Sequence, residues 1–311
     1  MRILVTGGAG FIGSHVVDGF VNAGHEVAVI DDLSTGNKAN LDSRVPLYQY
    51  DIREQALDKA FEEFKPDIVD HHAAQSNVPA SVADPVYDAS VNVLGGLNLL
   101  RLATRHNVRK FIYISSGGAM YGEPEPNMLP VPETAPVRPL SPYGASKQAV
   151  EAWLGVYRRT FGLDYTVLRY ANIYGPRQGI REEGAVVAVF ATRMAADQPV
   201  TIDGAGQQTR DFVYVGDCVT ANLAALERGS GCSVNIGTGR ETSVREIFDL
   251  LAEVAGYTQP PRFGPARTGD VMRIALNPAQ AREQLGWQAQ MPLHEGLAST
   301  YKFFSANGRS T

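Results

Sequence analysis

The first half of the chain alternates between two hydrophobic periodicities. Continuous apolar runs of strand length cover Arg2–Thr6, Glu26–Ile30, Asp67–His71 and Lys110–Ser115. Between these runs, apolar residues recur at the spacing of one helix face over Gly13–Ala23, Gln55–Glu63 and Val93–His106. Strands that alternate with helices predict right-handed βαβ units, and therefore an α/β fold with a doubly wound parallel sheet of the Rossmann type.

The elements become shorter in the second half. A helix that begins near Ser141 leads into a strand at Tyr165–Arg169, and the pattern loosens beyond Tyr170. The later segments with a helix or strand pattern are Ala185–Ala196, Val200–Ile202, Gln208–Val213, Ser233–Ile236 and a helix from Ser243. Because no clean boundary separates them from the first half, we expect a smaller α/β domain that is interleaved with the Rossmann sheet.

Composition and charge disfavour several classes of protein. The 311 residues carry a formal net charge of −5, which provides no basic surface for nucleic acid or for an anionic membrane. No apolar run approaches the roughly 20 residues of a membrane span, and the strand pattern at Arg2 leaves no room for a signal peptide. Cys218 and Cys232 are too few for a disulfide framework and lack the spacing of metal ligands. We therefore expect a cytoplasmic protein without a metal site.

A glycine-rich turn follows the first predicted strand. Gly7, Gly10 and Gly13 have the spacing G-x-x-G-x-x-G and open the first helix, whose free N–H groups attract phosphate. Asp31 ends the second strand, where a carboxylate can bind the ribose hydroxyls of a dinucleotide. Because this carboxylate repels a 2′-phosphate, the sequence favours NAD over NADP. Asp51-Ile52 ends the next strand and is expected beside the adenine.

A tyrosine and a lysine four residues apart open the helix after Ser141. Tyr143 and Lys147 then lie on one helix face, so both side chains can reach one site. The pKa of a free phenol is about 10, and a neighbouring ammonium group lowers it toward the working pH of a base. In a chain that also carries a dinucleotide fingerprint, this pair indicates proton transfer coupled to the redox chemistry of the cofactor.

The order of these motifs resembles the extended short-chain dehydrogenase/reductase family, and most specifically its UDP-glucose (UDP-galactose) 4-epimerases. The resemblance spans nearly the whole chain. The segments that carry it are Thr6–Gly13, Asp31–Gly36, His72–Gln75, Asn92, Ser141–Lys147, Arg169–Gln178, Arg210–Val215, Asn235–Gly239 and Arg267–Asp270. It implies an NAD-dependent isomerase that acts on a UDP-hexose.

The resemblance also implies roles for individual residues. Tyr143 is expected to be the catalytic base, and Lys147 to hold the nicotinamide ribose and lower the tyrosine pKa. Ser116 is the third expected catalytic residue, because it carries the hydroxyl closest to the position where relatives have one. The expected cofactor-binding residues are Gly7, Gly10, Phe11, Ile12, Gly13, Asp31, Asp32, Ser34, Thr35, Gly36, Asp51, Ile52, His72, Ala73, Ala74, Gln75, Asn92, Tyr143, Lys147, Tyr170 and Asn172. The expected substrate-binding residues are Ser116, Gly117, Tyr143, Asn172, Val186, Val187, Thr201, Gln208, Arg210, Arg267 and Asp270.

One segment departs from the family pattern. Where relatives carry a Ser or Thr that bridges the sugar and the tyrosine, this chain has Gly117, and Ser116 stands one residue earlier. The Ser116 hydroxyl could replace the missing group or bond to the strand backbone, and the pair Gly117-Gly118 is expected to leave a roomier pocket beside the sugar. The same turn lacks the Asp-Glu pair of the related 4,6-dehydratases and the Glu of the decarboxylases, which disfavours both reactions.

The resulting hypothesis is interconversion of UDP-galactose and UDP-glucose by oxidation at C4, rotation of the 4-keto sugar and reduction on the opposite face. Two alternatives stay open: an epimerase for a UDP-N-acetylhexosamine or a UDP-uronic acid, and a non-catalytic NAD-binding sensor. We expect an NAD-binding domain over residues 1–171 with a returning segment at about 209–256, and a mainly UDP-sugar-binding domain over 172–208 and 257–311. The resemblance implies a homodimer that pairs through helices near Val93–His106 and Ser146–Phe161.

Overall fold

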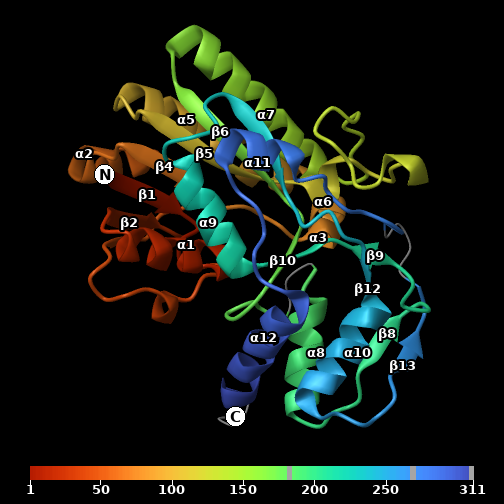
Figure 1. Ribbon diagram of the computed structural model, residues 1–311. Helices are drawn as coiled ribbons and strands as arrows, with labels where there is room; N and C mark the ends of the chain where they lie inside the picture. Colours follow the sequence, from red (N-terminus) through yellow and green to blue (C-terminus); the bar gives the residue numbers. More distant parts are fainter. Residues whose placement is uncertain (181–183, 267–270, 308–311) are drawn as a thin grey trace.

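The computed structural model describes residues 1–180, 184–266 and 271–307, which form two lobes (Figure 1). The larger lobe contains a seven-stranded parallel sheet with the order β11-β6-β5-β4-β1-β2-β3. Its strands are β1 (Arg2–Thr6), β2 (Glu26–Ile30), β3 (Leu47–Tyr48), β4 (Ile68–His71), β5 (Lys110–Ser116), β6 (Asp164–Tyr170) and β11 (Cys232–Ile236). The strand order reverses between β1 and β4, which is the switch point of a doubly wound sheet. The predicted fold class is confirmed.

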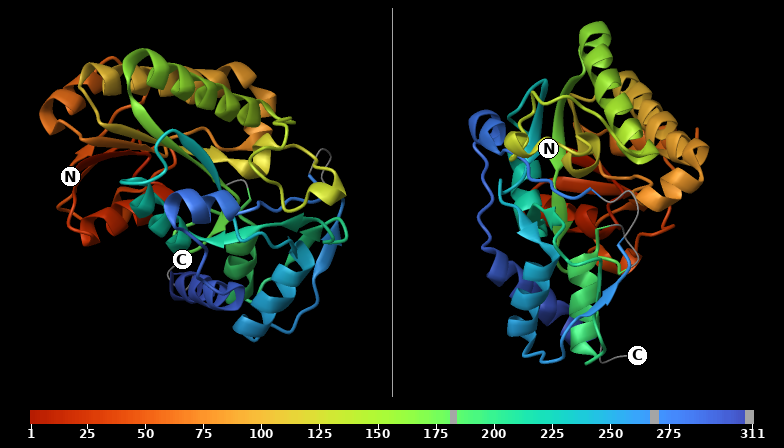
Figure 2. Two further views of the ribbon diagram at one scale, coloured as in Figure 1. Left: turned by 45° about the horizontal axis from the view of Figure 1, so that its top comes forward. Right: turned by 90° about the vertical axis from the view of Figure 1, so that its right-hand side faces the viewer.

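Helices cover both faces of this sheet, as the two views in Figure 2 show. One face packs against α1 (Phe11–Asn22), α9 (Val215–Ala225) and α11 (Ala279–Leu285). The other face packs against α2 (Leu57–Phe64), α5 (Gly96–Arg105) and α7 (Pro142–Phe161). Because helices bury both faces, strand residues such as Leu4 and Val69 are fully buried. The carboxyl ends of the strands form the edge at which such a sheet binds ligands.

Short elements follow several of these strand ends. The segment after β4 contains α3 (Val78–Ala83), α4 (Pro85–Ala89) and a π-helical stretch at Ser90–Gly95 that continues into α5. The segment after β5 begins with α6 (Gly117–Met120) and then runs irregularly to α7, as its prolines predict. These elements bring residues from distant parts of the sequence to the same edge of the sheet.

The smaller lobe has its own apolar core. It is formed by α8 (Val186–Ala195), α10 (Val244–Ala255) and α12 (Leu293–Asn307). Its short strand pairs are β8 (Thr201–Asp203) with β13 (Arg262–Gly264), and β9 (Thr209–Arg210) with β12 (Thr242–Ser243). A further pair, β7 (Asn172–Tyr174) with β10 (Phe212–Tyr214), connects the lobes, because β7 directly follows β6 of the large sheet.

The chain crosses between the lobes more often than the sequence predicted. Within the predicted returning segment 209–256, α9 and β11 belong to the larger lobe. Within the same segment, Ile247, Phe248 and Leu251 of α10 pack into the core of the smaller lobe. Further along the chain, Ala281 and Leu285 of α11 pack on the large sheet. The division of the remaining chain into two binding domains stays a prediction.

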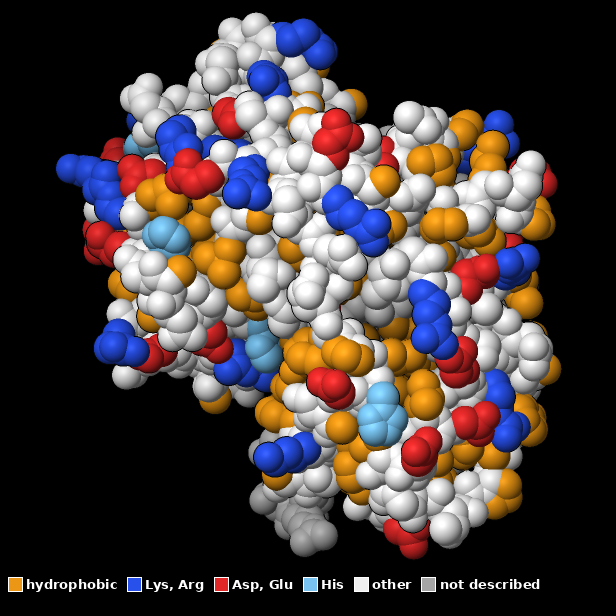
Figure 3. Space-filling view, in the orientation of Figure 1, with side chains coloured by type: hydrophobic (Ala, Val, Ile, Leu, Met, Phe, Trp, Pro, Cys, Tyr) orange, Lys and Arg blue, Asp and Glu red, His pale blue; other side chains and the backbone are white. Residues whose placement is uncertain are grey.

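The surface in the orientation of Figure 1 carries charges of both signs. Figure 3 shows Lys and Arg side chains interspersed with Asp and Glu side chains on this face. Within the described ranges, no helix is long and apolar enough to cross a membrane.

Candidate active site

The turn between β1 and α1 forms a tight backbone cradle. Gly7 has a φ angle of 67°, and a Cβ atom there would lie 2.6 Å from the backbone nitrogen of Ala73. A Cβ atom on Gly13 would lie 2.2 Å from the Gly7 carbonyl oxygen, so only glycine allows α1 to approach this turn. Phe11 and Ile12 begin α1 here, and the free N–H groups of a helix N-terminus favour phosphate. The cradle therefore fits the diphosphate of a dinucleotide.

Asp31 lies beside this cradle at the end of β2. Its carboxylate accepts hydrogen bonds from the backbone N–H groups of Ala9 and Leu33, each 2.9 Å long. Burial raises the pKa of the carboxyl group, and these two hydrogen bonds oppose the rise. The other predicted residues of this turn are Asp32, Ser34, Thr35 and Gly36, which follow it directly. The structure thus brings the predicted ribose-binding carboxylate next to the predicted phosphate cradle.

The loop after β4 closes the cradle from the other side. The N–H of His72 donates to the carbonyl of Thr6 over 3.0 Å. The Asn92 side chain holds the loop further along, because it accepts a bond from the N–H of Gln75 (3.0 Å) and donates one to the Gln75 carbonyl (2.9 Å). Ala73 and Ala74 lie between these two anchors. The predicted loop residues therefore surround one end of the glycine turn.

Several predicted cofactor contacts already have protein partners. The Asp51 carboxylate is bound by the guanidinium group of Arg53, and the side chain of Ile52 is buried. His72 Nε2 lies 3.3 Å from an oxygen of the fully buried Asp70. The Tyr170 side chain is also buried. Contacts from these four predicted side chains to a cofactor stay a prediction.

Tyr143 and Lys147 stand in the first two turns of α7. The helix begins there because the Ser141 hydroxyl caps it by accepting a bond from the N–H of Gly144 (3.2 Å). Lys147 Nζ donates a hydrogen bond of 2.8 Å to the carbonyl of Ile114 near the end of β5. It lies 5.7 Å from the centre of the Tyr143 ring. The two predicted side chains meet in one site at the carboxyl edge of the sheet.

The surroundings shift the proton affinities of both groups. Burial raises the pKa of Tyr143 above its ordinary value, and a hydrogen bond with the Ser116 side chain opposes this rise. Burial lowers the pKa of Lys147 to about 8, while the carboxylates of Asp88 and Glu151 oppose the fall. Lys147 therefore still carries a proton at neutral pH and presents a positive charge to the phenol. Formation of the phenolate requires more positive charge than the lysine alone provides.

Asp88 on α4 was missed by the sequence prediction. It is fully buried, and its carboxylate accepts hydrogen bonds from Ser146 Oγ (2.7 Å), Gln75 Nε2 (2.9 Å) and Asn92 Nδ2 (3.0 Å). The catalytic helix and the loop after β4 are thereby joined through one carboxylate. One signal in the sequence could have found it, since Asp88 and Asn92 have the four-residue spacing of neighbours on a helix face.

The departure from the family pattern lies where β5 meets α6. Hydrogen bonding with the Ser116 side chain opposes the rise in the Tyr143 pKa, so a hydroxyl lies near the phenol. The space beside Gly117 is filled, because a Cβ atom on this residue would lie 2.4 Å from Leu276 Cδ1. The expectation of a roomier pocket at Gly117 was therefore wrong: a leucine from a distant segment occupies that volume. A Cβ atom on Gly118 would meet only Asn172 Oδ1 at 3.5 Å and Ser116 Oγ at 4.0 Å.

The predicted substrate residues come from both lobes. Asn172 begins β7 and its side-chain amide lies near Gly118 and Gly184. Arg210 lies on β9 and donates to the carbonyl of Thr209 over 2.8 Å. The carbonyl of its neighbour Asp211 accepts a hydrogen bond from the N–H of Asn172 (2.9 Å). The two residues expected to hold a diphosphate are thus linked through the backbone.

The remaining predicted substrate-binding residues lie in different surroundings. Val186 begins α8, and Val187 is fully buried in the core of the smaller lobe. Contacts from these two residues to a substrate stay a prediction. Thr201 lies on β8 with an exposed side chain. Gln208 donates its side-chain amide to the carbonyl of Asp203 over 3.0 Å. The predicted Arg267 and Asp270 lie outside the described residues.

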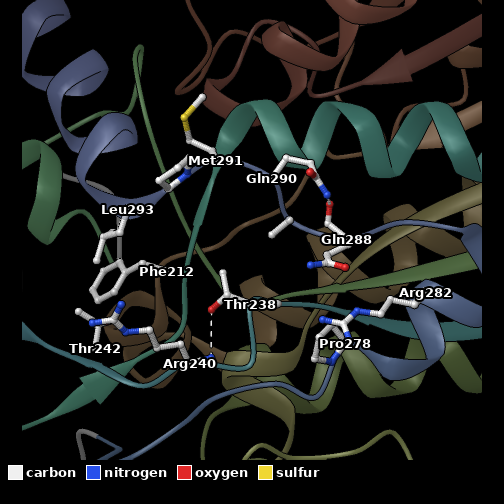
Figure 4. Close-up of a pocket in the computed structure, with 13 residues that line it drawn as sticks. Phe212, Thr238, Arg240, Thr242, Pro278, Arg282, Gln288, Gln290, Met291 and Leu293 are labelled. Carbon is white, nitrogen blue, oxygen red and sulfur yellow. Dashed lines mark hydrogen bonds between the residues drawn. The ribbon is translucent and has the colours of Figure 1, made fainter.

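A separate cavity of about 330 Å³ is lined by the loop after β11, by α11 and by the segment that leads into α12 (Figure 4). Arg240 and Arg282 line it, and Arg240 is paired with Glu246. Thr238 also lines it, and its hydroxyl donates to Asp211. The predicted catalytic side chains do not line this cavity.

The glycine cradle, the carboxylate at the end of β2 and the Tyr143–Lys147 pair define a dinucleotide-dependent enzyme of the short-chain dehydrogenase type. The profile of the NAD dependent epimerase/dehydratase family matches residues 3–237. This chain belongs to that family, which confirms the predicted family and the predicted cofactor.

Within this family, the chain is similar over its whole length to several UDP-glucose 4-epimerases. The UDP-glucose 4-epimerase of Mycolicibacterium smegmatis is 44% identical, over 98% of this chain and 98% of that protein. The crystal structure of UDP-glucose 4-epimerase from Thermotoga maritima, with UDP-glucose, has a TM-score of 0.96 and 46% identity over 99% of each chain. The UDP-glucose 4-epimerase of Thermus thermophilus, in complex with NAD, has a TM-score of 0.93 and 43% identity over 98% of this chain and 99% of that one.

Proposed function

We propose that this protein interconverts UDP-galactose and UDP-glucose by inverting the configuration at C4, with NAD as a retained cofactor. The observation that carries the proposal is the surroundings of Tyr143, whose phenol shares one site with the Lys147 ammonium group and the Ser116 hydroxyl. The similarity to UDP-glucose 4-epimerases over the whole chain supports the choice of substrate.

The residues present fit NAD. The cradle at Gly7 and the N-terminus of α1 would hold the diphosphate, and Asp31 would hold the adenosine ribose. Lys147, whose Nζ reaches the end of β5, would hold the nicotinamide ribose. When bound, NAD supplies a hydride acceptor and donor for C4, together with the positive charge that phenolate formation requires.

The protein groups would move the proton and hold the substrate. Tyr143 removes the proton of the C4 hydroxyl during oxidation and returns a proton to C4 oxygen during reduction. Ser116 bridges Tyr143 and the sugar oxygen, and Lys147 keeps a positive charge beside the phenolate. Asn172 and Arg210 hold the diphosphate by strong charge-assisted bonds, which leaves the 4-keto hexose free to turn over between the two half-reactions.

Two sister reactions lack their acid and base in this chain. A 4,6-dehydratase needs an Asp-Glu pair after the hydroxyl residue, and a decarboxylase needs a Glu in the same turn. Gly118 and Ala119 stand there. The site therefore supports chemistry at C4 alone.

The proposal is tested by incubating the purified protein with UDP-galactose in the absence of an added reductant. We expect UDP-glucose to form until the two sugars reach equilibrium, without net accumulation of NADH. Net NADH would contradict the proposal in favour of a dehydrogenase, and NAD binding without any turnover would favour the sensor. Parallel assays with UDP-N-acetylglucosamine and a UDP-uronic acid test the two alternative substrates.

We further propose that the protein is cytoplasmic and forms a homodimer. Exposed apolar side chains gather on α7 and on the neighbouring π-helical stretch, where Trp153 is 41%, Phe161 57% and Leu94 60% exposed. Exposed apolar patches of this kind mark interfaces, and a symmetric pair of copies would cover them. Sedimentation of the wild type as a monomer, or of Trp153→Glu as a dimer of unchanged stability, would contradict this assembly.

A further inference from the structure

The position of the catalytic hydroxyl depends on a side chain far away in the sequence. We propose that Leu276 is a positioning residue: it fills the space beside Gly117 and thereby fixes the start of α6 so that the Ser116 hydroxyl faces Tyr143. The kinetic part of this inference rests on the proposed function, whereas its structural part has a test of its own.

Leu276 is enclosed between two glycines. A Cβ atom on Gly117 would lie 2.4 Å from Leu276 Cδ1 and 3.0 Å from Cδ2. On the other side, a Cβ atom on Gly237 would lie 2.8 Å from Leu276 Cβ. The side chain is fully buried in a small apolar cluster with Tyr121 and Val131. Because interiors are close-packed, a side chain on either glycine would compete with Leu276 for the same volume.

The backbone around Leu276 is held in place on both sides. Its N–H donates to the carboxylate of Asp211 (3.1 Å), a residue that is 1% exposed. The same carboxylate accepts bonds from the N–H of Thr238 and of Gly239. Val131 anchors the segment a second time, because its N–H donates to Ala275 (2.7 Å) and its carbonyl accepts from Asn277 (2.9 Å). Leu276 therefore has little freedom to retreat from Gly117.

This contact involves the residue that directly follows Ser116. Ser116 is the last residue of β5, where it pairs with Tyr170, and α6 begins at the next residue. The Ser116 side chain leaves this extended backbone toward Tyr143. A hydroxyl on residue 117 would need the volume that Leu276 fills. The size of residue 276 and the position of the hydroxyl are consequently linked.

The kinetic experiment compares Leu276→Ala with Leu285→Ala, a fully buried leucine on α11 away from the site. For Leu276→Ala we expect kcat to fall roughly a hundredfold, as for other small misplacements of a catalytic group, while KM for UDP-galactose stays within about threefold because the nucleotide contacts are intact. The pH at which kcat reaches half its plateau should rise, since the Ser116 bond lowers the pKa of Tyr143. Leu276→Met, which preserves volume, and Leu285→Ala should keep kcat near the wild-type value.

A relocation experiment tests the link directly. Ser116→Ala should lose about a hundredfold in kcat, within the range of proton-transfer catalysis. Gly117→Ser alone should also lose activity, because Leu276 blocks the new side chain. In the triple variant Ser116→Ala, Gly117→Ser, Leu276→Ala, the new hydroxyl has room, and we expect kcat to recover at least about tenfold relative to Ser116→Ala.

Either of two kinetic results would overturn the inference: a loss in Leu276→Ala no larger than in Leu285→Ala, or a triple variant no more active than Ser116→Ala. Crystal structures of the wild type and Leu276→Ala test the role of Leu276 without an activity assay. We expect the hydrogen bond between Ser116 and Tyr143 to be present in the first and broken in the second, and an intact bond in both would overturn the inference. If the wild type does not epimerise UDP-galactose, the proposed function fails while these structures still decide the role of Leu276.

Discussion

The buried charge of Lys147 is predicted to lower the free energy of unfolding at neutral pH. Burial lowers its pKa from 10.5 to about 8, so its protonated form costs the folded state about 3 kcal/mol at pH 7, at about 1.4 kcal/mol per pKa unit. Replacement by methionine removes this charge at similar volume. It also removes the hydrogen bond to Ile114, which is worth about 1 kcal/mol. We therefore expect Lys147→Met to raise the free energy of unfolding at pH 7 by about 2 kcal/mol.

The pH dependence has a definite sign. Because the pKa of Lys147 is lower in the folded state, the unfolded wild type binds more protons between about pH 8 and pH 10.5. Wild-type stability therefore rises with pH across this window. Lys147→Met lacks the group, so its advantage shrinks and by pH 10.5 turns into a deficit of about 1 kcal/mol from the lost hydrogen bond.

Urea unfolding of both proteins at pH 7 and near the upper end of this window measures the effect. Lys59→Met, at an exposed lysine on α2, is the matched control and should change the free energy of unfolding by less than about 0.5 kcal/mol at either pH. A Lys147→Met protein that is less stable than the wild type at pH 7, or whose difference from it does not depend on pH, would refute the reasoning.

The same substitution should slow catalysis. With the ammonium group 5.7 Å from the Tyr143 ring centre, an effective dielectric constant of about 20 gives an attraction of about 3 kcal/mol for the phenolate. Its loss corresponds to roughly a hundredfold lower kcat. A Lys147→Met enzyme within about threefold of the wild-type kcat at pH 7 would contradict this role.

Three further substitutions test the cradle, its carboxylate and the scaffold behind it. Gly7→Ala should abolish NAD binding in calorimetry, because its methyl group meets the backbone of Ala73 at 2.6 Å; unchanged affinity would contradict the cradle. Asp31→Asn should weaken NAD binding at least about tenfold and reduce the ratio of the affinity for NAD to that for NADP. An unchanged ratio would argue against this ribose contact. Glu151→Gln leaves the buried Arg169 without its counter-ion and should lower the free energy of unfolding by about 3 kcal/mol; urea unfolding with a loss under about 1 kcal/mol would contradict it.

Local patterns were sufficient for most of the cofactor half of the site. The glycine spacing after β1 and the acid at the end of β2 are separated by one helix, and the parallel sheet places both at one edge. Tyr143 and Lys147 are joined by helical spacing alone. Each of these relations follows from the regular geometry of a single element or of neighbouring strands.

Packing between distant segments could not be predicted in this way. The volume beside Gly117 is filled by Leu276, and nothing in the pattern around either residue indicates that they meet. The buried carboxylate of Asp211 binds two separate loops, although its sequence neighbours suggest only a short strand. Likewise, α10 has an ordinary amphipathic pattern that does not specify which lobe its apolar face joins.

The central claim is that Tyr143 is the base for inversion at C4. The most direct test compares wild type and Tyr143→Phe, each with the same content of bound NAD, in the conversion of UDP-galactose to UDP-glucose. The account predicts equilibration by the wild type and a kcat about a thousandfold lower in the variant, because the phenolic hydroxyl is the only group lost. A Tyr143→Phe enzyme that equilibrates the two sugars at the wild-type rate would contradict it.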